Sequence, residues 1–132
     1  MRIFPTAALA LTLGMLTATS AASAASIIGS WSGRGTVRLA SGQVEPVSCR
    51  VSFEKGDSRG RTFTFDAKCA ATAGTFTLYG RVSKRSTSSY RGSIYGDQSI
   101  ASGKVSISLR GNSQSVNVSS SKGSGSFNLR RR

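Results

Sequence analysis

The chain has 132 residues, of which 18 are lysine or arginine and 5 are aspartate or glutamate, and it contains two cysteines and no histidine. The lack of histidine argues strongly against a catalytic triad with an imidazole base and against a histidine-based metal site. The acidic residues are scattered along the chain, which argues against paired catalytic carboxylates. We therefore expect a protein that is not an enzyme and that uses no metal or cofactor.

Residues 1–25 have the pattern of a secretory signal peptide. Arg2 precedes an apolar run from Ala7 to Leu16, and small residues around Ala24 fit a cleavage site. The apolar run is about half of the roughly 20 residues that a membrane-spanning helix needs. We therefore expect a single mature domain of residues 26–132 that is periplasmic or secreted and has no transmembrane segment.

From residue 28 onward, apolar and polar side chains alternate in short segments, which is the period of a half-buried β-strand. In the first segment Trp31, Val37 and Leu39 share the inward parity. Glycine-containing or polar turns separate the segments, and helical periodicity is absent. The predicted strands are residues 28–39, 44–54, 62–69, 75–83, 89–96, 100–110, about 116–118, and 127–129.

Eight short strands joined by tight turns favour an all-β fold, an antiparallel up-and-down meander that closes into a small barrel. A two-sheet β-sandwich is the alternative. Glycines on the inward parity mark either close packing around bulky residues or room for a cavity. The candidate residues for lining such a cavity are Trp31, Phe63, Phe65 and Tyr90.

The two cysteines lie on the apolar parity of two consecutive predicted strands. If the turn between these strands is centred near Arg59, Cys49 lies opposite Cys69 and Val51 lies opposite Ala67. This is a suitable position for a cross-strand disulfide, and an exported protein meets the oxidising conditions that form one. We therefore predict a structural Cys49–Cys69 disulfide.

The positive charge is the strongest functional signal in the sequence. Removal of residues 1–25 leaves a net charge of +12, which predicts attraction to polyanions. Because export argues against nucleic acid as a partner, we expect anionic envelope material such as lipopolysaccharide, anionic lipid or acidic polysaccharide. The predicted anion-binding residues, all on the outward parity, are Arg34, Arg38, Arg50, Arg81, Arg91 and Arg110.

Three short stretches carry a resemblance to known proteins: residues 29–35 (Gly-Ser-Trp-Ser-Gly-Arg-Gly), residues 47–51 (Val-Ser-Cys-Arg-Val) and residues 68–70 (Lys-Cys-Ala). Together with the export signal, they resemble the small, uncharacterised exported proteins of Gram-negative alphaproteobacteria. In size, single disulfide and all-β layout, the chain is also similar to the periplasmic barrel inhibitors of secreted metalloproteases. That second resemblance implies an N-terminal arm that enters a protease cleft.

The leading hypothesis from the sequence is a non-enzymatic exported protein that associates with anionic envelope components through its basic outer face. Two alternatives stay open. The first is a carrier of a small apolar ligand inside the barrel, and the second is a periplasmic protease inhibitor.

Overall fold

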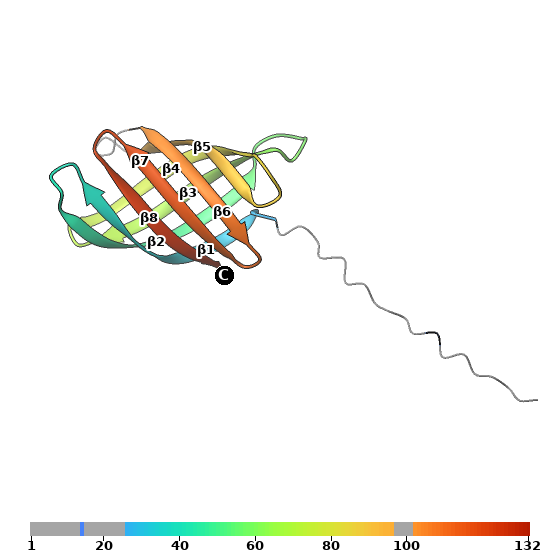
Figure 1. Ribbon diagram of the computed structural model, residues 1–132, viewed down its shortest axis with the longest axis horizontal. Coiled ribbons are helices and arrows are strands. Elements are labelled where there is room, and N and C mark those ends of the chain that lie inside the picture. The colour runs from blue at the N-terminus through green and yellow to red at the C-terminus, as the bar shows by residue number, and fades with distance from the viewer. Residues whose placement is uncertain (1–13, 15–25, 97–101) are drawn as a thin grey trace, which may run out of the picture.

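The computed structural model describes residues 14, 26–96 and 102–132, and residues 26–96 and 102–132 form one closed barrel of eight antiparallel strands (Figure 1). Each strand pairs with its neighbours in sequence, and the last pairs with the first. The strands are β1 (Gly29–Leu39), β2 (Val44–Lys55), β3 (Thr62–Ala71), β4 (Gly74–Lys84), β5 (Ser89–Gly96), β6 (Gly103–Arg110), β7 (Ser113–Ser120) and β8 (Gly123–Arg131).

The predicted meander barrel is confirmed, and the sandwich alternative does not form. The last two strands are longer than expected. Their serine-rich ends are paired with the neighbouring strands, but these ends contain no alternating apolar residues that would predict a strand. Two predictions fall outside the described residues. These are the start of the sixth strand at residue 100 and the signal peptide of residues 1–25, of which only Gly14 is described.

The predicted register of the β2–β3 hairpin is also confirmed. Cys49 pairs with Cys69 and Val51 pairs with Ala67, and the two cysteines form a disulfide. The turn between the strands is closed by the Arg61 amide, which donates to Asp57 Oδ1 at 3.1 Å. The disulfide therefore lies inside the barrel wall, where it joins two strands that are already paired.

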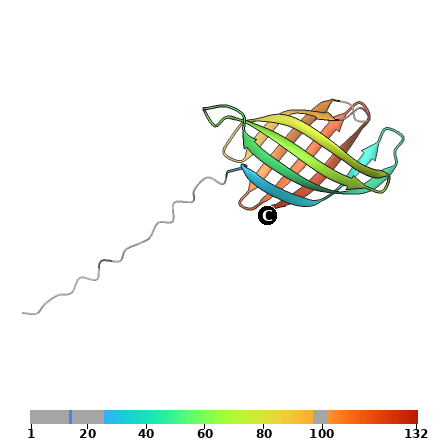
Figure 2. The same cartoon turned by 180° about the vertical axis from the view of Figure 1, so that it is seen from behind.

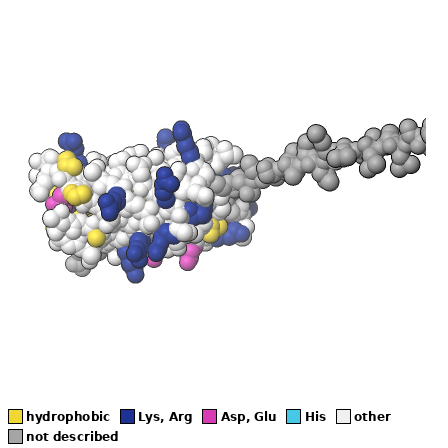
Figure 3. Space-filling view, turned by 90° about the horizontal axis from the view of Figure 1, so that it is seen from below, with side chains coloured by type: hydrophobic (Ala, Val, Ile, Leu, Met, Phe, Trp, Pro, Cys, Tyr) yellow, Lys and Arg dark blue, Asp and Glu magenta, His cyan; other side chains and the backbone are white. Residues whose placement is uncertain are grey.

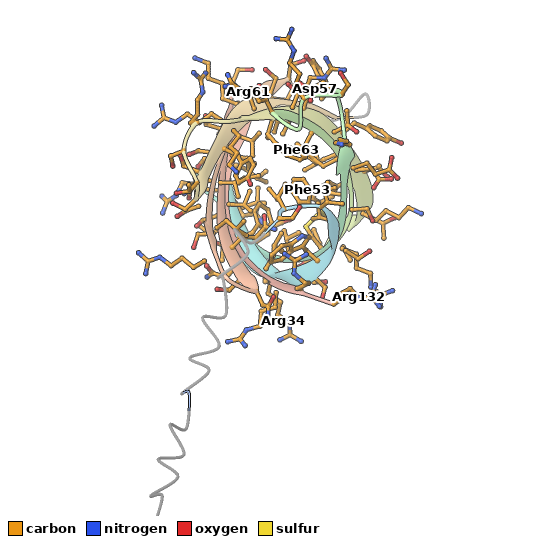
Figure 4. All side chains as sticks on the ribbon, turned by 90° about the vertical axis from the view of Figure 1, so that its right-hand side faces the viewer. Arg34, Phe53, Asp57, Arg61, Phe63 and Arg132 are labelled. Carbon is orange, nitrogen blue, oxygen red and sulfur yellow. A yellow bond between two sulfur atoms is a disulfide. The ribbon has the colours of Figure 1, made fainter. Side chains whose placement is uncertain are left out.

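One end of the barrel is filled by aromatic side chains. Trp31 is completely buried, and its Nε1 donates to the Ile27 carbonyl at 2.9 Å. The rings of Phe63 and Tyr90 meet edge to face at 5.6 Å, and burial raises the pKa of the Tyr90 phenol. Figure 4 looks into this end and shows Phe63 within the ring of strands.

At the opposite end the inward parity does not bring full burial. Val37 and Val118 are only partly buried, and Leu39 is 38% exposed although it has the same parity as Trp31. Leu39 is the last residue of β1, so the barrel wall does not extend past it to cover its side chain. The expectation that Leu39 lies in the core is therefore wrong.

One polar residue occupies a core position that the sequence pattern did not reveal. Gln114 is 3% exposed, and within the described part of the chain neither its Nε2 nor its Oε1 has a hydrogen-bond partner. Its cross-strand neighbours are Leu109 and Leu129, both buried. An unpaired amide in such surroundings lowers the stability of the folded state.

Reduction of the Cys49–Cys69 disulfide should lower the free energy of unfolding by about 3 kcal/mol, because the bridge closes a loop of some 20 residues in the unfolded chain. Urea denaturation with and without dithiothreitol measures the difference. The Cys49→Ala/Cys69→Ala variant is the control and should not respond to reductant. Equal stability of the oxidised and reduced protein would contradict a structural role.

Replacement of Gln114 by leucine should raise the free energy of unfolding by about 1–2 kcal/mol, because it removes two unpaired polar atoms and keeps the side-chain volume. Chemical denaturation checks this. Gln114→Ala is the comparison and should gain less, because it leaves a cavity. A leucine variant that is less stable than the parent would show that the amide is satisfied inside the barrel.

Candidate ligand pocket and basic surface

A pocket of about 380 Å³ opens at the end of the barrel opposite Trp31. We call it the open-end pocket. It lies between the β1–β2, β3–β4 and β7–β8 connections, which are gathered at the left of Figure 1. Its apolar lining consists of Val37, Leu39, Val47, Ala71, Ala73, Phe76, Leu78, Ile94, Val118 and Phe127.

Polar groups are confined to the edge of the open-end pocket. Glu45 and Lys122 supply one charge of each sign, and serines of β7 and β8 supply hydroxyl groups. Below the pocket lies a central cavity of about 40 Å³, whose wall includes Leu78, Val118 and Phe127 from the pocket above. The open end can therefore receive an apolar group and orient a polar group at its edge.

The residues predicted to line a cavity lie elsewhere. Trp31, Phe63 and Tyr90 pack at the closed end and line neither the open-end pocket nor the central cavity, whereas Phe65 lines the central cavity. Aromatic size was the signal behind that prediction, but large rings fill space. The open-end pocket instead has small inward residues beside the turns, such as Val37, Ala71 and Val118, and its wall also contains Phe76 and Phe127.

Four basic side chains are brought into one line on the outside of the barrel. The cross-strand pairs run from Arg110 through Ser113, Arg130 and Ser32 to Arg50 and Lys68. We call Arg110, Arg130, Arg50 and Lys68 the basic row. Figure 3 shows Lys and Arg side chains over one side of the barrel, with few acidic side chains among them.

Two shallow depressions follow the basic row. One, of about 640 Å³, is lined by Arg34, Arg50 and Lys68, and the other, of about 530 Å³, is lined by Arg110 and Arg130. Both also include Ser32 and Gly33, so they adjoin each other across β1. Of the predicted anion-binding residues, the fold thus brings together Arg34, Arg50 and Arg110, and it adds Lys68 and Arg130.

The other predicted anion-binding residues lie apart from the basic row. Arg81 pairs with Ser93, two residues from Arg91 on the same outer face of β5, so these two arginines are diagonal neighbours. Arg38 lies near the open end, where it pairs with Val44 and Ser124. The six predicted arginines therefore form one larger group, one pair and one separate residue.

The C-terminal arginines have a structural role that the sequence did not reveal. The Arg131 guanidinium lies 4.3 Å from the centre of the Trp31 ring, and it donates to the Ile28 carbonyl at 2.9 Å and to Asn112 Oδ1 at 3.2 Å. It also donates to the Ser26 carbonyl. Arg131 thus fastens the segment before β1 to the end of β8 and covers the closed end.

Within the described ranges, no group of three or more acidic or cysteine side chains is placed to hold a metal ion. Among the same residues, no helix has the length and apolar character needed to cross a membrane.

No protein-family model matches the chain, and no curated protein matches it in sequence. Solved structures with a similar fold include designed proteins. A de novo designed fluorescence-activating β-barrel is 19% identical, with a TM-score of 0.60 over 80% of this chain and 93% of its own. A redesigned β-barrel is 15% identical, with a TM-score of 0.63 over 80% of this chain and 90% of its own.

Another redesigned barrel, mFAP0, bound to DFHBI, is 17% identical, with a TM-score of 0.63 over 79% of this chain and 97% of its own. At such identities the likeness concerns the fold alone. The chain is therefore a small eight-stranded antiparallel β-barrel that resembles designed fluorescence-activating barrels.

Proposed function

We propose that this protein is an exported, non-enzymatic binding protein that holds a small apolar ligand in the open end of its barrel. The observation that carries the proposal is the asymmetry of the interior. Trp31, Phe63 and Tyr90 fill one end, and an apolar pocket of about 380 Å³ occupies the other. That volume falls within the range of about 300–1,000 Å³ that is common for small-molecule sites.

The composition of the pocket indicates the class of ligand. Its apolar wall favours a hydrocarbon or aromatic body, since burial of apolar surface contributes roughly 25 cal/mol per Å². Glu45, Lys122 and the serines at the edge favour a polar end that stays near the solvent. The fold is compatible with this use, because the similar barrel mFAP0 is a structure with the small molecule DFHBI bound.

We infer export from the signal-peptide pattern of residues 1–25, and ligand binding in the pocket needs no cofactor. The geometry in front of β1 favours ligand binding over protease inhibition. An inhibitory arm must be free of its own barrel, whereas Ile27 is fully buried and the Ile28 carbonyl is bound by Arg131. The described segment in front of β1 is thus held by the barrel.

A second proposal, association with anionic envelope components, is supported by the basic row. Arg50 and Lys68 are direct cross-strand partners, and like charges in such positions repel each other. An anionic phosphate or carboxylate between them would offset this repulsion through charge-assisted hydrogen bonds. The two proposals are compatible, because the open-end pocket is inside the barrel and the basic row is outside.

The open-end pocket should bind the neutral dye N-phenyl-1-naphthylamine, and linear alcohols should displace it. Each added CH₂ group contributes about 0.8 kcal/mol of transfer free energy, so affinity should rise about fourfold per carbon until the pocket is full. Dye fluorescence measures the displacement. An affinity that does not depend on chain length would contradict an apolar site.

A matched pair of variants locates the binding. Ala71 lines the open-end pocket, whereas its neighbour Ala70 faces outward. Ala71→Phe should fill the pocket and weaken dye binding at least tenfold, and Ala70→Phe should leave it unchanged. Circular dichroism checks that both variants remain folded. Equal effects of the two substitutions would place the dye outside the barrel.

Vesicles that contain phosphatidylglycerol, and lipopolysaccharide, should retain the protein at about 50 mM salt and release it at about 500 mM, because screening weakens attraction between exposed charges. Co-sedimentation measures this. Arg50→Glu/Arg130→Glu, with both substitutions in the basic row, should bind more weakly than Arg81→Glu/Arg91→Glu, which has the same net charge. Equal loss in both variants would show that total charge, and not the basic row, determines retention.

A further inference from the structure

Two tyrosines on the outer wall are not explained by either proposal. Tyr79 is 53% exposed and Tyr95 is 54% exposed, and they are direct partners across β4 and β5. Side chains in such positions have their Cβ atoms about 5 Å apart on the same face. Strands β3, β4 and β5 face the viewer in Figure 2, so the two rings form one exposed aromatic platform on that side of the barrel.

Polar side chains surround this tyrosine platform, and they include both hydrogen-bond donors and hydrogen-bond acceptors. Asp66 pairs with Tyr79 from the β3 side, and Ser52 pairs with Asp66 in turn. The next row contains Glu54, Thr64 and Arg81, which are also linked by pairing. All these residues and both tyrosines line one outer depression of about 410 Å³.

We propose that the tyrosine platform binds a neutral saccharide. A sugar ring has an apolar C–H face that packs on an aromatic ring, and its hydroxyl groups both donate and accept hydrogen bonds. Tyrosine suits this role because it offers a rigid, amphipathic surface at low entropic cost. The Asp66 and Glu54 carboxylates accept hydrogen bonds from hydroxyl groups, and the Arg81 guanidinium donates to them.

The charges around the tyrosine platform favour a neutral ligand over the anions that are expected at the basic row. The depression holds the Asp66 and Glu54 carboxylates beside Arg81, and Arg50 and Lys68 lie in the adjacent row, so an anion that approached these cations from the platform side would also be repelled by the two carboxylates. A purely apolar partner would cover the three charged groups of the depression and leave them without hydrogen bonds, at a cost in free energy. A neutral ligand rich in hydroxyl groups avoids both penalties.

The size of the platform fits a short oligosaccharide. The row Ser52, Asp66, Tyr79, Tyr95 crosses four neighbouring strands, and adjacent strands are about 4.8 Å apart, so the row is roughly 14 Å long. The parallel row that contains Arg81 lies about 7 Å away, at the spacing of residues i and i+2. These dimensions match a linear trisaccharide that lies across the strands.

The test is an aromatic NMR titration of the full mature protein with four neutral trisaccharides: maltotriose, cellotriose, laminaritriose and chitotriose. At least one should shift the ring signals of Tyr79 and Tyr95. The buried Tyr90, which is 1% exposed, should not move and is the internal control. Absence of a shift at both exposed rings with all four sugars overturns the proposal.

Variants then connect the shifts to the platform. Tyr79→Ala and Tyr95→Ala should each weaken binding about tenfold, whereas Tyr79→Phe should keep most of the affinity because the ring remains. Asp66→Asn should bind more weakly than the parent protein but should still bind. Affinity that is unchanged in both alanine variants overturns the proposal, as does concentration-dependent dimerisation through the two tyrosines in the absence of sugar.

Discussion

The barrel is closed because β1 pairs with both β2 and β8. This pairing requires the β1 backbone to lie very close to β8, and a Cβ atom at Gly33 or Gly35 would overlap the carbonyl groups of Asn128 or Ser126. Closure removes every sheet edge, which matters for a chain whose strands would otherwise expose unpaired amides. Closure also places Arg131 over the Trp31 ring, so the first and last strands of the barrel stabilise each other.

Once the barrel is closed, the packing of the inward side chains decides what each end can do. Trp31, Phe63 and Tyr90 fill the closed end, whereas the other end keeps an open pocket although Phe76 and Phe127 are part of its wall. The outer surface is independent of this division, because alternate residues of each strand face outward. The same wall can therefore hold an apolar ligand inside and, outside, both the basic row and the tyrosine platform, which lie in adjacent rows where they meet on β2 and β3.

Much of this architecture could be predicted from the sequence, because strict alternation and short turns are local signals. The pairing of Cys49 with Cys69 followed from parity and the position of one turn. Local patterns could not show which end is open, since Leu39 and Trp31 have the same parity and differ only in their height along the barrel. The contact of Arg131 with Trp31 joins strands that are remote in sequence, and no local pattern indicates it. Gln114 shares the parity of Val116 and Val118, but an amide side chain carries no apolar signal that would extend the predicted core to it.

We propose that the interior, which is closed at one end, binds its ligand at the other. The most direct test is a methyl NMR titration of the mature protein with a neutral linear alcohol. Methyl signals of Val37, Leu78 and Val118 should shift, while those of Ile27 and Leu109, which line neither cavity, should stay in place. Shifts confined to Ile27 and Leu109, or no shift of any inward methyl group, would contradict this proposal.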